Sequence, residues 1–185
     1  MSPNEVRAEG WPSPPGGRFF VLTGKTQSGK TTFLSERVAA ARGLGVRVQG
    51  YLSRVVRDQD AVAGYDLLNL EDGKSAPFLR KERRPGWQTV GPYGLVPETL
   101  DIALGIIRRA EGAHPLVVDE IGPLELEGRG VWPALASALG ARSEATLLVI
   151  REGLIDAFRP KIPALERALI FGVGDRAAAD EALGG

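Results

Sequence analysis

Residues 24–31 read Gly-Lys-Thr-Gln-Ser-Gly-Lys-Thr and match the pattern G-x-x-x-x-G-K-[ST] at every fixed position. The mostly apolar residues 18–23 before this stretch predict a strand, and residues 32–42 after it predict a helix. In such a context the loop turns successive backbone N–H groups inward, and the helix presents its positive N-terminal end. Both features favour the β- and γ-phosphates of a nucleotide, so the stretch predicts a phosphate-binding P-loop.

Two side chains of this loop have specific expected roles. Lys30 would neutralise phosphate charge as a point cation, and the hydroxyl of Thr31 would be a ligand of Mg²⁺. The predicted nucleotide-binding residues are Gly24, Lys25, Thr26, Gln27, Ser28, Gly29, Lys30, Thr31 and Thr32.

The composition excludes several other kinds of site. Lys plus Arg and Asp plus Glu both total 23, so a globally basic nucleic-acid binder is not indicated. The chain has no Cys, which removes thiol nucleophiles and Cys-ligated zinc. Its single His, His114, cannot form a metal-binding cluster of histidines and argues against a Ser-His-Asp hydrolase. Any metal should therefore be a hard cation held by oxygen atoms, which indicates Mg²⁺.

The 185 residues suit one domain. Residues 1–17 are rich in Pro and Gly and lack the apolar core of a signal peptide, so they predict a flexible N-terminal extension before a single domain at 18–185. No apolar run approaches the roughly 18 residues that span a bilayer. We therefore expect a soluble, cytoplasmic protein.

Apolar runs that alternate with helical segments predict an α/β fold of the P-loop NTPase type, with a mostly parallel sheet and helices on both faces. The expected strands are residues 18–23, 46–56, 61–70, 77–80, 115–119, 145–150 and 169–173. The expected helices are residues 32–42, 97–110, 131–139, 156–168 and 176–183. Residues 46–82 predict an antiparallel β-hairpin insertion at one edge of the sheet. Residues 81–97 hold three prolines and three glycines, and these predict a loop.

A second half of the site follows at residues 116–120, Leu-Val-Val-Asp-Glu. This pattern is typical of a Walker B strand, in which buried aliphatic residues deliver a carboxylate to the edge of the sheet where ligands bind. Asp119 would hold Mg²⁺ through water, and Glu120 would orient or deprotonate the attacking water. Glu125 is an alternative water activator, or it caps the next turn.

Several stretches together resemble the THEP-type nucleoside-triphosphatase family. They are residues 24–31, Gly-Tyr-Leu at 50–52, Gly-Tyr-Asp-Leu at 64–67, Val-Gly-Pro-Tyr at 90–93, Asp-Glu-Ile-Gly-Pro-Leu-Glu at 119–125 and Gly-Val-Gly-Asp-Arg at 172–176. The resemblance implies a small Mg²⁺-dependent P-loop enzyme that hydrolyses ATP, GTP and other nucleoside triphosphates with little base selectivity. Lys25 and Gln27 depart from the small residues or Pro common in that family's loop.

Three basic residues allow further roles. Lys25 lies five residues before Lys30, the spacing at which dimerising P-loop ATPases carry a lysine that acts across an interface. A lysine at the rim of the pocket is the simpler interpretation, so we expect a monomer, with a dimer through Lys25 as the alternative. Arg129 lies between two glycines and Arg151 ends a predicted strand. Either could stabilise charge in the transition state.

Two other functions remain open at this stage. A small nucleotide or nucleoside kinase would transfer the phosphoryl group to an acceptor other than water. A nucleotide-dependent switch module would use hydrolysis only as a timer. The sequence has no Asn-Lys-x-Asp motif, which disfavours a guanine-specific switch.

Overall fold

The strand β1 (Phe19–Gly24) shows how the sequence pattern sets the architecture. Successive side chains of a strand point to opposite faces of the sheet. Phe19 and Val21 accordingly join one buried hydrophobic cluster, while Phe20 and Leu22 join the other. All four side chains are buried. A strand that is apolar on both faces is stable only inside a sheet that is covered on both sides.

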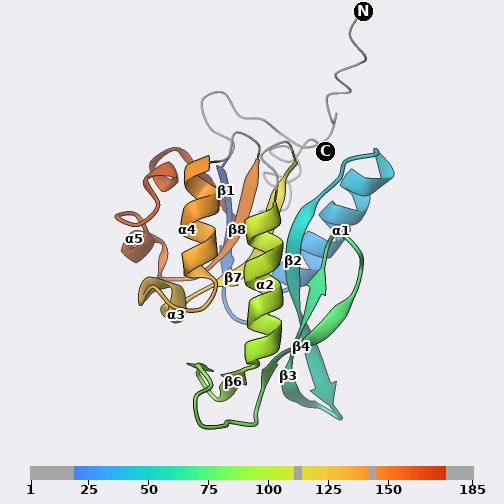
Figure 1. Ribbon diagram of the computed structural model, residues 1–185. Coiled ribbons are helices and arrows are strands. Elements are labelled where there is room, and N and C mark those ends of the chain that lie inside the picture. The colour runs from blue at the N-terminus through green and yellow to red at the C-terminus, as the bar shows by residue number, and fades with distance from the viewer. Residues whose placement is uncertain (1–18, 111–113, 142–144, 174–185) are drawn as a thin grey trace, which may run out of the picture.

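The computed structural model describes residues 19–110, 114–141 and 145–173, which form a nine-stranded sheet (Figure 1). The strand order is β5-β6-β4-β3-β2-β7-β8-β1-β9. The parallel strands are β2 (Gln49–Asp58), β7 (Leu116–Ile121), β8 (Thr146–Arg151), β1 and β9 (Leu169–Gly172). The antiparallel extension consists of β3 (Ala61–Asn69), β4 (Ser75–Arg80), β5 (Thr89–Val90) and β6 (Tyr93–Leu95).

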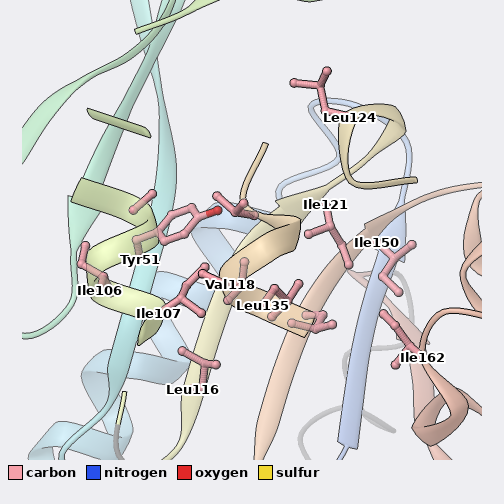
Figure 2. Close-up of a cluster of buried hydrophobic side chains, with 14 of the residues drawn as sticks. Tyr51, Ile106, Ile107, Leu116, Val118, Ile121, Leu124, Leu135, Ile150 and Ile162 are labelled. Carbon is pink, nitrogen blue, oxygen red and sulfur yellow. The ribbon is translucent and has the colours of Figure 1, made fainter. Parts of the chain in front are cut away.

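Helices cover both faces, as predicted. The helix α1 (Lys30–Gly43) packs on one face through Phe33, Leu34 and Val38. On the other face, α2 (Pro97–Arg109) and α4 (Trp132–Ala141) pack against each other and against the sheet (Figure 1). Figure 2 shows Ile106 and Ile107 of α2 in the same buried cluster as residues of β7 and β8. The short elements are α3 (Pro123–Leu126), α5 (Ile155–Phe158) and a 3-10 helix, Pro163–Arg167.

Gly50 shows why the parallel core and the antiparallel extension share the strand β2. Residues Gln49–Tyr51 pair in parallel with Leu116–Val118, and from Tyr51 onward β2 also pairs antiparallel with β3. At Gly50, φ is 111°, and a Cβ atom there would lie 1.8 Å from the carbonyl oxygen of Val117. Glycine is therefore required for the backbones of β2 and β7 to approach this closely.

The structure confirms the predicted fold class and corrects four details. Residues 156–168 do not form one helix, because Pro160 and Pro163 each remove a backbone N–H and disfavour helical geometry at the preceding residue. Residues 81–97 are not entirely a loop, since β5 and β6 lie within them and lengthen the antiparallel extension. The first strand of the predicted insertion, β2, belongs also to the parallel core, and the helix α3 was not predicted.

Two predicted segments, the extension at residues 1–17 and the helix at residues 176–183, lie outside the described residues. Among the described helices, none has both the length and the apolar character needed to cross a membrane.

Candidate active site

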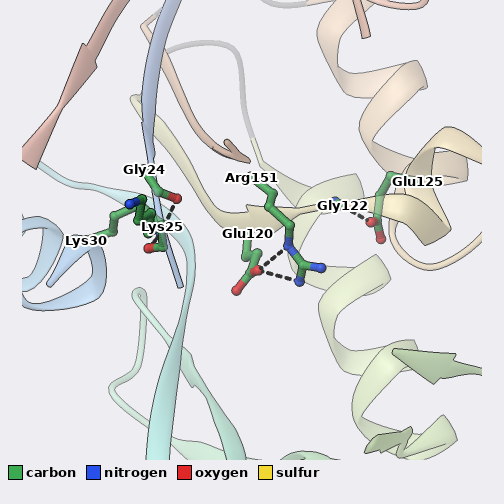
Figure 3. Close-up of polar contacts among 7 residues, drawn as sticks. All are labelled: Gly24, Lys25, Lys30, Glu120, Gly122, Glu125 and Arg151. Atoms are coloured by element: carbon green, nitrogen blue, oxygen red, sulfur yellow. Dashed lines mark hydrogen bonds and ion pairs between the residues drawn. The ribbon is translucent and has the colours of Figure 1, made fainter. Parts of the chain in front are cut away.

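The P-loop connects the end of β1 to the first turn of α1. Its chain reversal uses left-handed backbone at Gln27, where φ is 61°, and at Gly29, where φ is 89°. In the described residues, no side chain caps the N-terminus of α1, so the first-turn N–H groups are available to an anion. The ammonium group of Lys30 donates to the carbonyl oxygens of Gly24, at 2.9 Å, and Lys25, at 2.6 Å (Figure 3). These hydrogen bonds hold the ammonium group of Lys30 against the loop, where it would bind phosphate.

A groove of about 550 Å³ runs over this loop. Of the nine predicted nucleotide-binding residues, those that line it are Thr26, Gln27, Gly29, Lys30, Thr31 and Thr32. The other three, Gly24, Lys25 and Ser28, lie in the loop but do not line the groove. The opposite wall comes from β2 and β3 and includes Ser53, Arg54, Arg57 and Tyr65.

Asp119 and Thr31 are 88 residues apart in sequence and in direct contact in the structure. The Thr31 hydroxyl and the Ser53 backbone N–H both donate to Oδ2 of Asp119, at 2.8 and 3.0 Å. Burial raises the pKa of Asp119 from its ordinary 3.8 to about 6, although these two hydrogen bonds act in the opposite direction. A hydroxyl and a carboxylate at one point are hard oxygen donors. They fit Mg²⁺, which uses few protein ligands and keeps water and phosphate oxygens for its other positions.

Glu120 is aimed into the groove by an irregularity in the strand β7. The pairing of β7 with β8 shifts between Val118 and Ile121, and Glu120 has the left-handed φ of 69°. Consecutive residues of a regular strand point to opposite faces, but a bulge re-aims a side chain. As a result, the side chains of both Asp119 and Glu120 line the groove.

The carboxylate of Glu120 is paired with Arg151 at the end of β8. Arg151 donates from Nη2 at 2.8 Å and from Nε at 3.2 Å, and each side chain is about one-third exposed (Figure 3). Arg151 is also in register with Gly24, the first residue of the P-loop. These two residues are 31 positions apart in the sequence, and no motif links them. The structure brings them together because β8 lies between β7 and β1.

Glu125 is buried, and its carboxylate is occupied by the backbone. Gly122 N–H donates to Oε2 at 2.9 Å, and Val131 N–H donates to Oε1 at 3.2 Å. Burial raises the pKa of Glu125 above its ordinary value, against the effect of these hydrogen bonds. This arrangement favours the capping role of Glu125 over its alternative role as the water activator.

Arg129 and Lys25, two of the three basic residues given further roles above, do not line the groove. Arg129 is exposed and pairs with Glu127 at 3.0 Å. The side chain of Lys25 is exposed, and the backbone carbonyl of Lys25 accepts a hydrogen bond from Lys30. No sequence motif pointed to Arg54 and Arg57, which bring positive charge to the groove from β2. Only the pairing of the strands places them there.

A P-loop that follows a buried strand, with a carboxylate on its Thr31 from the parallel strand two positions away in the sheet, defines a P-loop nucleoside triphosphate-binding domain. The profile of the family described as NTPase matches residues 19–176, and the chain belongs to that family. A nucleoside-triphosphatase THEP1 from Thermofilum pendens is 34% identical over 122 residues, which are 65% of this chain and 66% of that protein. The THEP1 protein of Pyrococcus abyssi is 33% identical over 147 residues, 77% of this chain and 79% of that one.

Two solved structures share the fold. A human cancer-related nucleoside triphosphatase superposes with a TM-score of 0.70 at 27% identity, over 90% of this chain and 94% of that chain. THEP1 from Aquifex aeolicus superposes with a TM-score of 0.69 at 22% identity, over 88% of this chain and 95% of that one.

Proposed function

We propose that the chain hydrolyses nucleoside 5′-triphosphates to diphosphates and inorganic phosphate, with Mg²⁺ and with little selectivity among bases. The observation that carries this proposal is the contact between Thr31 and Asp119 with Glu120 beside it. One sheet edge thus carries the residues that we assign to the phosphate cradle, the metal site and the base. Family membership and the triphosphatase names of the relatives support the reaction class.

Each site residue has a role in this reaction. Lys30 and the N–H groups of the loop hold the β- and γ-phosphates. Thr31 and Asp119 hold Mg²⁺, which when bound would neutralise charge that develops on the phosphate oxygens. Glu120 orients the attacking water and accepts its proton. Arg151 holds the carboxylate of Glu120 in place.

The substitution Lys30→Ala tests this assignment. It removes the cation fixed beside the loop, so turnover should fall to background. The measurement is the release of inorganic phosphate and nucleoside diphosphate, in the presence of Mg²⁺, from a panel of ribo- and deoxyribonucleoside triphosphates. Near-normal activity in the purified variant would rule out the proposed site.

The same panel tests base selectivity in the unaltered protein. Purine and pyrimidine triphosphates should both be hydrolysed. A preference above about 1000-fold for one base, equivalent to about 4 kcal/mol, would show instead that a dedicated base-reading pocket exists.

A further inference from the structure

A second cavity, of about 240 Å³, opens beside the P-loop groove. The residues that line both are Thr26, Ser53, Tyr65, Asp119 and Glu120. Of the described loop residues at 24–32, Thr26 alone lines this second cavity. The cavity is therefore a neighbour of the phosphate cradle that meets it at the two carboxylates, and we refer to it as the side cavity.

The walls of the side cavity are mainly apolar and aromatic. The antiparallel extension and the strand β2 contribute Tyr51, Phe78, Leu79, Val90, Tyr93 and Leu95. The rings of Tyr51 and Phe78 meet edge to face at 5.8 Å, and those of Tyr65 and Tyr93 at 5.5 Å. A water molecule gains nothing from such walls, whereas an apolar ligand gains free energy for the surface it removes from water.

One end of the side cavity is polar. Glu120 and Arg151 form their ion pair there, and both line the cavity. Asp119 and Glu125 also line this cavity. Burial, and after it the charges of Glu125, Asp119 and Glu120, raises the pKa of the Tyr51 hydroxyl well above its ordinary value. A ligand that fills the cavity would thus have an apolar body among rings and a polar group at Glu120.

The proposed placement of the γ-phosphate leaves the side cavity to a molecule other than the nucleotide. With the phosphates on the P-loop and the γ-phosphate at Glu120, the ribose and base are attached beyond the α-phosphate, at the opposite end of the triphosphate. Glu120 lines both the groove and the side cavity, whereas Lys30 and Thr31 line the groove alone. On this placement the side cavity adjoins the γ-phosphate at Glu120, and its occupant is a second molecule that can supply the nucleophile.

We propose that the side cavity binds the ring-bearing body of a small alcohol and places its hydroxyl at Glu120, where it accepts the γ-phosphoryl group in place of water. The hydroxyl oxygen forms a bond to the γ-phosphorus. The bond from that phosphorus to the β–γ bridging oxygen breaks, and its electron pair leaves with the nucleoside diphosphate. The hydroxyl proton passes to the carboxylate of Glu120. This transfer rests on the proposed function, because it uses the same cradle and the same base.

The test uses the full chain with Mg²⁺ and ATP, and with either benzyl alcohol or ethanol at equal concentration. ADP, inorganic phosphate and the phosphate monoester are quantified by phosphorus NMR. The ratio of benzyl phosphate to inorganic phosphate should rise with benzyl alcohol and saturate. Because the cavity buries the ring, this ratio should exceed that of ethyl phosphate by about tenfold or more.

Val90→Trp provides the matched variant, because the larger side chain would occupy the cavity from β5. The ester-to-phosphate ratio should fall by about tenfold. Ile102→Trp is the control, since Ile102 is 44% exposed on α2 and lines neither the groove nor the cavity. The ratio does not depend on how much of each variant is folded.

The outcomes separate this inference from the proposed function. Phosphate release without benzyl phosphate overturns the inference and leaves hydrolysis in place. An ester ratio that does not saturate, that equals the ethanol ratio, or that is unchanged in Val90→Trp also overturns it, because such transfer needs no cavity. Failure to form ADP under any condition overturns the proposed function itself.

Discussion

At the scale of single residues, Glu120 has both an unusual backbone conformation and a charged partner on the next strand. Its φ of 69° is uncommon for a residue other than glycine, and Arg151 holds its carboxylate at 2.8 Å. Strained backbone of this kind persists only where the surrounding structure imposes it, and it gathers at functional sites. Here the conformation places a second carboxylate beside Asp119.

Glu120→Gln keeps the size of the side chain but removes its basicity. If Glu120 activates the nucleophile, the hydrolysis rate should fall by roughly 10²–10⁴. Affinity for the Mg²⁺-nucleotide should change little, because Lys30, Thr31 and Asp119 still hold the ligand. Single-turnover hydrolysis and equilibrium nucleotide binding measure the two effects.

The matched control for this experiment is Glu125→Gln. It leaves one buried N–H donor facing an amide group, so unfolding free energy should fall by about 1–3 kcal/mol. Hydrolysis per folded molecule should stay close to that of the unaltered protein. The reverse pattern, a dead Glu125→Gln and an active Glu120→Gln, would transfer the role of base to Glu125.

Asp119 should make the protein less stable as the pH rises. Its pKa is raised from 3.8 to about 6 in the folded state, so the folded state binds the proton more tightly than the unfolded chain does. That contribution is complete below pH 3.8 and is lost as the pH rises through 6, a difference of up to roughly 3 kcal/mol. Asp119→Asn should remove this dependence and stabilise the protein at pH 7.5.

Urea unfolding of the unaltered protein and of Asp119→Asn from pH 4 to pH 7.5 checks this expectation. The quantity to compare is the difference in unfolding free energy between the two proteins at each pH. A variant that is less stable than the unaltered protein at pH 7.5 would show that hydrogen bonding outweighs desolvation at this carboxylate. Its nucleotide hydrolysis should nevertheless be lost, because Asp119 is a proposed metal ligand.

At the scale of elements, the junction between β2 and β7 joins the two halves of the sheet. Ser53 follows this junction on β2, and its N–H donates to Asp119 on β7. The close backbone approach at Gly50 therefore also sets the position of the proposed metal ligand.

Gly50→Ala should separate these strands, since its Cβ would lie 1.8 Å from the Val117 carbonyl oxygen and the residue has φ of 111°. We expect a loss of unfolding free energy of about 3 kcal/mol or more, with weaker nucleotide hydrolysis per folded molecule. Gly43→Ala is the matched control, because a Cβ there meets nothing within 4 Å. It should be neutral or stabilising by up to about 1 kcal/mol. Equal effects in the two variants would contradict the close-approach argument.

At the scale of the whole molecule, the site lies where the parallel strands β1, β7 and β8 end together. The strands β2 and β3 supply the opposite wall of the groove, and the antiparallel extension supplies aromatic and aliphatic residues to the side cavity. Every predicted catalytic and metal-binding residue, Lys30, Thr31, Asp119 and Glu120, reaches this one groove within a single chain. The arrangement supports our expectation that a monomer is active.

Specific activity should accordingly stay constant over about a 100-fold range of protein concentration, because one chain supplies all four of these residues. Lys25→Ala should keep most of the activity, since the Lys25 side chain is exposed and only its backbone serves Lys30. Activity that rises with concentration and is lost in Lys25→Ala would instead establish the dimer in which this lysine acts across an interface.

The P-loop, the Walker B strand and the α/β class could be predicted from the sequence alone, because each depends on local order: apolar residues in a run, glycines at fixed spacing and carboxylates at a strand end. The secondary structure predicted from the sequence was wrong in two segments that contain several prolines, residues 81–97 and 156–168. The helix expected over 156–168 is broken at two prolines. In the Gly- and Pro-rich segment, β6 forms because β4 offers it an edge, and β5 pairs with β6.

The pairing of Glu120 with Arg151, the burial of Glu125 and the side cavity depend on tertiary packing. The pairing and the cavity join residues from different strands, and Glu125 is buried where α3 packs beside α4. The strand order follows from how both faces of the sheet are covered. Strand order is a property of packing, in which distant apolar surfaces are buried together. Local sequence therefore specified the parts of the site, and packing specified which of them touch.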